Sequence, residues 1–131
     1  MVAVTRTTRR PIAGRFARVN ADLFAGISVR DYQGALAWYE KLFGCEPAFR
    51  PNDVEAVWEV DEHRYVYVEN RPDHAGHALI TIFVDDLDAR LEQISSRGLS
   101  PAEQETYENG VRKATFRDPE GNEFGIGGPT E

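Results

Sequence analysis

The sequence predicts an α+β fold of two β-α-β-β-β modules that form a curved mixed sheet around a cleft. One observation is an order of signals that occurs twice: a strand, a capped helix, a glycine and then short strands. The other is spacing, since Val29-Arg30-Asp31 and Val84-Asp85-Asp86 lie 55 residues apart, and Gly44 and Gly98 lie 54 apart. A single module leaves one face of its sheet without a helix, so two modules can set those faces toward each other.

The first module is predicted over about residues 23–70. Residues 23–29 (LFAGISV) have the composition of a strand. Apolar side chains then recur at helical spacing over 31–43, with Asp31 placed as the N-cap and Gly44 as the glycine that ends the helix. Three short strand-like segments follow, at about residues 46–50, 54–60 and 64–69.

The second module is predicted over about residues 78–127, after a connector rich in Pro, Gly, Asn and Asp. Residues 78–84 (ALITIFV) indicate a strand, and Asp85-Asp86 is expected to cap a helix that Gly98 ends. Two further strands are indicated at 111–117 and 123–126. The turn between them, D-P-E-G-N, has the proline and glycine positions of a type I turn.

The charge is divided unevenly along the 131 residues, whose formal net charge is −7. Residues 1–21 hold five arginines and no acidic side chain, and the remaining residues hold 10 basic and 22 acidic ones, a net charge of −12. We therefore predict a basic N-terminal arm over 1–21 and a single acidic domain over 22–131. An acidic domain repels nucleic acid and favours a neutral or cationic small molecule. We also hypothesise that the arm lies across an acidic surface of its own or a partner subunit.

The single Cys45 excludes an internal disulfide and favours a reducing, cytoplasmic location. No apolar stretch approaches the roughly 18 residues of a membrane span, so no membrane partner is expected. The first residues lack the apolar core of a signal peptide. Their Arg- and Thr-rich composition faintly resembles that of a mitochondrial presequence, although the prolines and glycines favour a surface arm.

Three segments together resemble the vicinal oxygen chelate superfamily, which groups glyoxalase I, extradiol dioxygenases and bleomycin-resistance proteins. They are 27–31 (ISVRD), 37–44 (AWYEKLFG) and 116–122 (FRDPEGN). The resemblance extends over about residues 23–127 and implies a glyoxalase/bleomycin-resistance-like fold. It also implies a homodimer, in which the pocket is often built across or beside the subunit interface.

The resemblance further implies where a divalent metal would be held, because catalytic members use His, Gln or Glu at defined strand positions. Those positions correspond here to Phe24, Leu79 and Gly125, which have no side-chain donor atom for a metal. We therefore predict no metal, no cofactor and no assigned catalytic residue, and an enzyme is less expected than a binding protein. One displaced metal set stays open as an alternative: His77, Glu69 and Glu123.

Strand alternation predicts which side chains line the cleft. Side chains at alternate positions of the first strand of each module, and of 64–69, are expected to face it, while their neighbours pack under the helices. Trp58 can face either side. The predicted ligand-binding residues are Phe24, Ser28, Trp58, Tyr65, Tyr67, Glu69, Thr81, Phe83 and Glu123.

These observations favour a metal-free small-molecule-binding protein of the bleomycin-resistance type. It would hold an aromatic or cationic organic ligand by stacking, with Glu69 or Glu123 offsetting positive charge. One alternative is a metal-dependent lyase, isomerase or dioxygenase that uses the displaced set. A second alternative is an interaction module whose cleft is filled by its own side chains.

Overall fold

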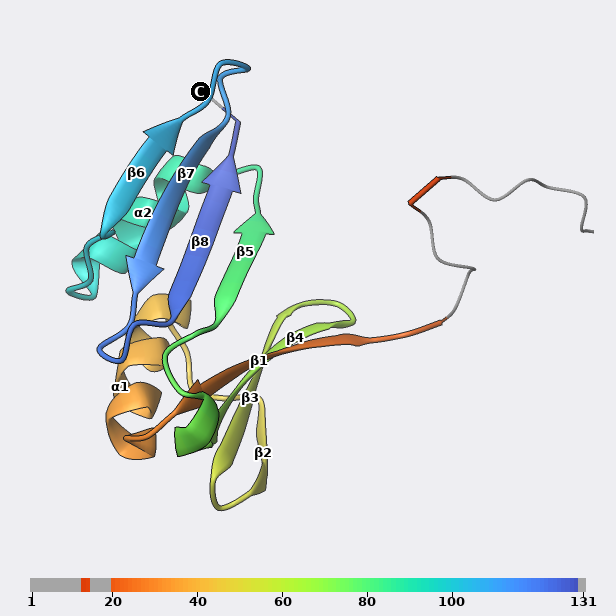
Figure 1. Ribbon diagram of the computed structural model, residues 1–131. Coiled ribbons are helices and arrows are strands. Elements are labelled where there is room, and N and C mark those ends of the chain that lie inside the picture. Colours follow the sequence, from red (N-terminus) through yellow and green to blue (C-terminus); the bar gives the residue numbers. More distant parts are fainter. Residues whose placement is uncertain (1–12, 15–19, 130–131) are drawn as a thin grey trace, which may run out of the picture.

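The computed structural model describes residues 13–14 and 20–129, which form two four-stranded mixed sheets and two α-helices (Figure 1). This confirms the α+β class with its repeated β-α-β-β-β order. Most of the predicted arm, residues 1–12 and 15–19, lies outside the described residues. Neither α-helix of the described part has the length and apolar character needed to cross a membrane.

The first sheet, called sheet A, is formed by the first module. Its strands are β1 (Leu23–Val29), β2 (Phe49–Asn52), β3 (Glu55–Asp61) and β4 (Arg64–Asn70). Their spatial order is β1-β4-β3-β2, in which β1 runs parallel to β4 and the other pairs are antiparallel. Because β1 stands at one end of this order, it is an edge strand of the sheet, and helix α1 (Tyr32–Phe43) follows it in the chain.

The second sheet, called sheet B, repeats this topology. Its strands are β5 (Leu79–Phe83), β6 (Glu103–Thr106), β7 (Arg112–Arg117) and β8 (Glu123–Gly128). Their order is β5-β8-β7-β6, with β5 parallel to β8. Helix α2 (Leu87–Ser96) follows β5, and a short 3₁₀ helix, η1 (Pro72–His74), lies in the connector between the modules.

The ends of α1 follow the predicted capping, whereas the start of α2 does not. The Asp31 carboxylate accepts a hydrogen bond from the Gly34 N–H at 3.0 Å, and Gly44 adopts the left-handed conformation at φ 77°. At α2, the Asp86 carboxylate accepts from Arg90 Nε at 2.8 Å and caps no backbone N–H. The side-chain cap expected at Asp85-Asp86 is thus absent, and Asp86 instead forms an ion pair with Arg90, one turn further into the helix.

Two edge strands differ from the sequence prediction. Strand β2 begins at Phe49, later than the predicted segment at 46–50, and β6 falls in a segment where the sequence indicates no strand. All four side chains of each strand are exposed. A strand exposed on both faces has no apolar alternation, which is the signal that marks the other strands.

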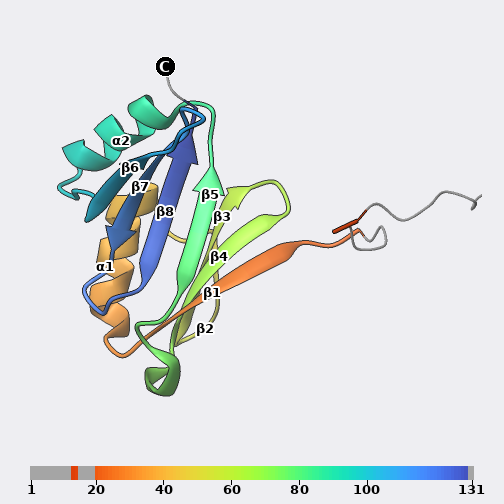
Figure 2. The same ribbon diagram turned by 45° about the horizontal axis from the view of Figure 1, so that its top comes forward.

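Both modules contribute to one hydrophobic core. The predicted alternation is observed in β1 and β4, where Ile27 and Val68 are buried toward the helix side. Phe43 of α1 bridges the sheets, because its ring centroid lies 5.3 Å from that of Trp58 on β3 and 5.3 Å from that of Phe124 on β8. The helix-covered faces of the two sheets therefore meet around α1, and the opposite face of each sheet, its open face, is turned outward (Figure 2). The expectation that the two uncovered faces are set toward each other is thus wrong within one chain, because the shared core joins the helix-covered faces instead.

The turn after β7 joins the modules through buried hydrogen bonds. Asp118 is 4% exposed, and its carboxylate accepts from the Tyr39 hydroxyl of α1 at 2.8 Å. The Asn122 side chain donates to the Ser28 carbonyl at 3.1 Å and accepts from the Ala78 N–H at 2.9 Å. A buried carboxylate that accepts several hydrogen bonds is stable only while all of its partners stay in place.

The same turn reaches the start of α1 through its glutamate. The Glu120 carboxylate accepts hydrogen bonds from the N–H groups of Arg30 and Asp31 at 2.7 and 2.8 Å. These two donors stand immediately before the helix, where a negative charge is favoured. We call residues 118–122 the clasp, since the segment that carries the family resemblance holds the two modules together.

Candidate functional site

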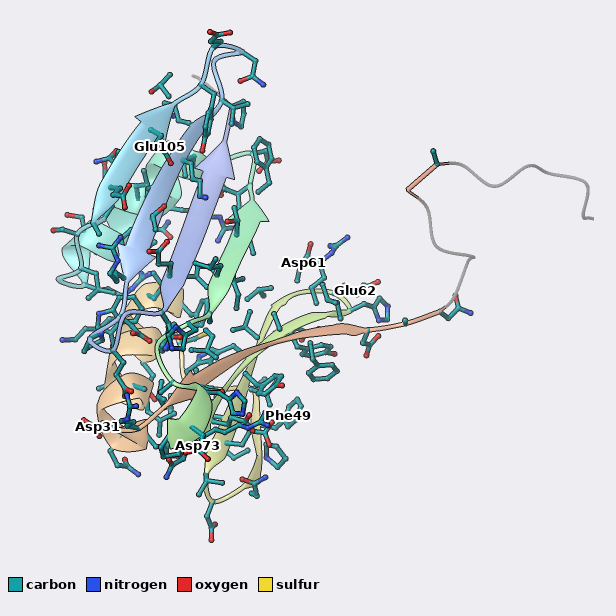
Figure 3. All side chains as sticks on the ribbon, in the orientation of Figure 1. Asp31, Phe49, Asp61, Glu62, Asp73 and Glu105 are labelled. Carbon is teal, nitrogen blue, oxygen red and sulfur yellow. The ribbon has the colours of Figure 1, made fainter. Side chains whose placement is uncertain are left out.

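The open face of sheet A presents a cluster of aromatic rings. Phe24 of β1 stacks on Tyr65 of β4, with ring centroids 4.6 Å apart and planes inclined by 12°. Phe49 of β2 meets Tyr65 edge-on at 6.5 Å, and Figure 3 shows it on the outer part of this sheet. Phe24 and Phe49 are 48% and 46% exposed. Stacked rings left open to solvent form a surface on which a planar ligand can stack.

Tyr67 continues this surface toward the centre of the sheet. It lies beside Gly26 in the β1–β4 register, and its ring atoms come within 2.6 Å of the place where a Cβ of residue 26 would stand. Any larger residue at position 26 would displace the ring, so the glycine allows the tyrosine to lie flat over β1. We call Phe24, Phe49, Tyr65 and Tyr67 the aromatic platform.

Carboxylates surround the aromatic platform. Glu59 is the cross-strand neighbour of Tyr65, and Glu55 is that of Glu69. Desolvation, followed by the charges of Glu59 and Asp22, raises the pKa of the Tyr65 phenol, which stays protonated and can donate a hydrogen bond. The Glu69 carboxylate lies 3.7 Å from Arg71. An aromatic surface next to carboxylates is suited to an aromatic ligand with positive charge.

The open face of sheet B combines apolar side chains with an ion-pair network. Leu79 and Phe83 of β5 are 79% and 64% exposed, which is unusual for large apolar side chains on one strand. Arg117 of β7 binds two carboxylates, that of Glu103 at 2.9 Å and that of Glu123 at 3.2 Å. Glu123, predicted to offset the charge of a ligand, is therefore already paired with an arginine.

Within a single chain, the described residues do not fit a divalent metal. Phe24, Leu79 and Gly125 offer no donor atom, and the side chain of Lys113 extends over Gly125, with its Cε 2.6 Å from the place of a Cβ there. An ammonium group beside such a position disfavours a second cation. The displaced set is dispersed, with Glu69 on sheet A, Glu123 on sheet B and His77 exposed in the connector. Within residues 13–14 and 20–129, no three His, Cys, Asp or Glu side chains are placed to hold a metal.

A groove of about 810 Å³ runs between the edge strands β1 and β5. The β3–β4 hairpin forms one wall, and apolar side chains of β5 such as Ile80 and Ile82 form the other. Its rim carries Asp61, Asp85 and Asp86. The groove separates the two sheets along their unpaired edges, so the open faces border it without stacking on each other.

Eight of the nine predicted ligand-binding residues lie on the open faces of the two sheets. Phe24, Ser28, Tyr65, Tyr67 and Glu69 share the open face of sheet A. Thr81, Phe83 and Glu123 share that of sheet B, and Tyr65, Thr81 and Phe83 also border the groove.

Trp58 is the exception, because it is only 1% exposed and lies on the core face of sheet A. Its register partner is Val66, another core residue, and its indole N–H donates to the Cys45 carbonyl at 3.0 Å. The prediction of Trp58 as a ligand-binding residue is therefore replaced by a role in the core. The side chain is both large and amphipathic, and the sequence alone did not fix its direction.

Two residues of these faces were not among the predicted ones. Phe49 was missed because the edge strand that carries it shows no alternation. Lys113 lies in the predicted strand 111–117, where alternation with the buried Ala114 would have placed it on the open face.

Comparison with known proteins agrees with this architecture. The family model of the Glyoxalase/Bleomycin resistance protein/Dioxygenase superfamily matches residues 19–126. The crystal structure of a glyoxalase/bleomycin resistance protein from Catenulispora acidiphila DSM 44928 is 52% identical, with a TM-score of 0.81, over 83% of this chain and 98% of that one. No curated protein shows significant similarity to the chain.

Two more distant structures share the fold alone. A bleomycin-binding protein in complex with bleomycin is 21% identical, with a TM-score of 0.67, over 86% of this chain and 100% of that one. A lactoylglutathione lyase from Agrobacterium tumefaciens is 18% identical, with a TM-score of 0.64, over 84% and 94%. By its sequence match and its two repeated modules, the chain belongs to the Glyoxalase/Bleomycin resistance protein/Dioxygenase superfamily.

Proposed function

We propose that the chain is a metal-free protein that binds an aromatic, positively charged organic molecule on the aromatic platform. The observation that carries the proposal is the stacked, solvent-open pair of Phe24 and Tyr65, with carboxylates beside it. A cation held against such rings gains about 0.5–2 kcal/mol of binding free energy, and the neighbouring Glu59 and Glu69 add Coulomb attraction. The cytoplasmic location expected from the single Cys45 is part of this proposal.

The pocket of this proposal is formed by two copies of the chain. In one chain the open faces point outward and leave Phe24, Leu79 and Phe83 exposed. A two-fold dimer that sets the open face of sheet A on one protomer against that of sheet B on its partner covers these side chains. It also encloses two equivalent clefts, because a symmetric interface uses the same pair of surfaces twice. The bleomycin-binding structure with the same fold supports ligand binding as the role.

A matched pair of probes tests the proposal by isothermal titration calorimetry. The probes are 1-naphthylmethylammonium and 1-naphthalenemethanol, which share a ring system and differ in charge. We expect the cation to bind more tightly, and Phe24→Ala to weaken its binding about tenfold, as loss of a stacked ring and a cation–π contact requires. Gln33→Ala serves as the control, because Gln33 is exposed on α1 and lies on neither open face.

Two results would overturn the proposal. One is equal affinity of the wild type, Phe24→Ala and Gln33→Ala for the cation, which would leave the aromatic platform without a role. The other is a stoichiometric transition metal in protein purified without chelator and lost on His77→Ala, which would favour the metal-dependent alternative.

A further inference from the structure

We propose that Lys113 is an anion-binding residue at the centre of the open face of sheet B, where it receives a carboxylate or similar oxyanion of the bound molecule. The proposal deepens the proposed function and rests on it, since it names a second group that the ligand of the same cleft carries. Its basis is the path of the lysine side chain and the absence of an acidic partner for it among residues 13–14 and 20–129.

The lysine side chain lies flat across the sheet. In the β7–β8 register Lys113 is opposite Gly127, yet its Cε reaches over Gly125, two residues along β8. Thr81 Oγ1 of β5 approaches the same point, 3.0 Å from the place of a Cβ at residue 125. Because Gly125 has no side chain, the lysine can cross β8 toward β5. The ammonium group is thereby directed to the middle of the face, beside a threonine hydroxyl.

The carboxylates of this face are engaged by other groups. Arg117 binds Glu103 and Glu123. Glu105, the cross-strand neighbour of Lys113, accepts a hydrogen bond from the Tyr107 hydroxyl at 3.3 Å. Within the described part of the chain no carboxylate lies within ion-pair distance of the Lys113 ammonium.

Lys113 is half-buried on a face with Leu79 and Phe83 and has no counter-ion among the described residues, so its ammonium group is suited to bind an anion. Apolar neighbours lower the local dielectric constant and strengthen the attraction between the ammonium and a carboxylate. The threonine hydroxyl of Thr81 offers a further hydrogen bond to an oxyanion. The ligand that satisfies both faces of the cleft is an amphoteric aromatic compound, with its positive group toward sheet A and its negative group toward sheet B.

The composition of the chain offers a direct test, because Lys41 and Lys113 are its only lysines. Reductive methylation with ¹³C-formaldehyde keeps their charge and gives each lysine its own NMR signal. We titrate with 2-naphthoate and with the neutral 2-naphthamide. We expect 2-naphthoate to shift the Lys113 signal saturably and to leave that of Lys41, on the exposed side of α1, in place.

Calorimetry on two variants completes the test. Lys113→Met should lower the affinity for 2-naphthoate about tenfold, as expected for a lost charge-assisted hydrogen bond, and leave that for 2-naphthamide unchanged. Lys41→Met, which removes the same charge elsewhere, should change neither.

If 2-naphthamide binds and Lys113→Met leaves the affinity for 2-naphthoate unaltered, the lysine assignment is wrong while the proposed cleft stands. Equal losses in the Lys113→Met and Lys41→Met variants would likewise overturn it, since they would reflect net charge alone. If the wild type binds none of 2-naphthoate, 2-naphthamide and 1-naphthylmethylammonium, the lysine assignment and the proposed function fail together.

Discussion

Two buried tyrosines in α1 have opposite hydrogen-bonding situations. The Tyr39 hydroxyl donates to the Asp118 carboxylate in the clasp. The Tyr32 hydroxyl is buried and has no hydrogen-bond partner among the described residues. Burial of an unpaired hydroxyl costs free energy, whereas loss of a donor to a buried carboxylate removes a charge-assisted bond. The same Tyr→Phe change should therefore act differently at the two positions.

We predict that Tyr39→Phe lowers the free energy of unfolding by about 1–3 kcal/mol, because the Asp118 carboxylate loses a donor. Tyr32→Phe should leave the free energy of unfolding unchanged or raise it. Urea denaturation followed by circular dichroism measures both. A Tyr39→Phe variant as stable as Tyr32→Phe would show that the clasp hydrogen bond contributes nothing.

The same hydrogen bond has a pH signature. Burial, and then the charge of Asp118, raises the pKa of Tyr39 above its ordinary value near 10. The stability that this tyrosine supplies is thus complete below about pH 10 and is lost as the pH rises further, because only the unfolded chain then releases the proton. We expect the difference in free energy of unfolding between wild type and Tyr39→Phe to narrow from pH 9 to pH 11. Because both proteins contain the other tyrosines, the ionisation of those tyrosines cancels in the comparison. A difference in free energy of unfolding that stays constant from pH 9 to pH 11 would contradict the role assigned to Tyr39.

At the scale of the elements, the sequence was most informative where a single residue type determines the backbone. Asp31 and Gly44 predicted both ends of α1, because a capping carboxylate and a left-handed residue are local requirements. Strand β6 had no such signal, and Trp58 fits either face of its strand. Those outcomes depend on which neighbouring surface is available, and that is decided by packing between modules.

Gly44 and Gly98 follow α1 and α2 and form a matched pair for testing that packing. Both have positive φ, 77° and 96°. A Cβ at residue 44 would stand 2.9 Å from the guanidinium of Arg97, whereas nothing lies within 4 Å of a Cβ at residue 98. Arg97 donates to the carbonyls of Lys41 and Leu42, which end α1.

We predict that Gly98→Ala costs about 1 kcal/mol in free energy of unfolding from backbone strain alone. Gly44→Ala should cost more, because it also disturbs the Arg97 contacts. Thermal unfolding of the two variants, each combined with Arg97→Ala, checks the explanation. In the Arg97→Ala background the two glycine variants should become equally destabilising, and a persistent difference would exclude the arginine as its cause.

At the scale of the whole molecule, the aromatic face of the site was largely predictable. Alternation in two short strands was enough to place Phe24, Tyr65 and Tyr67 together. The relation between the two open faces was not predictable, because it follows from the packing of both helix-covered faces around α1. The alternation of apolar and polar residues predicts which face of a strand is buried, but it does not predict which other element packs against that face.

The proposed division into a basic arm and an acidic domain gives a prediction at the same scale. If residues 1–20 lie across an acidic surface, their deletion should lower the melting temperature or weaken a dimer. The loss should be greater at 20 mM than at 500 mM salt, because salt shortens the range of charge interactions. A full-length variant with the five arginines of the arm replaced by glutamine separates charge from chain length. Unchanged behaviour of both variants at low salt would refute the idea.

The clasp holds the two modules together by contacts that do not involve the connector, so we predict that the covalent connection between them is dispensable. Tyr39, Ser28 and the start of α1 are bonded to residues 118–122, and both halves contribute to one core. The connector around Asp73 is exposed and carries none of these bonds (Figure 3). A backbone nick there should leave the two halves associated, and separately expressed halves should reconstitute the folded domain. The protein is thus a natural candidate for a split reporter, in which reassembly of two halves is the signal.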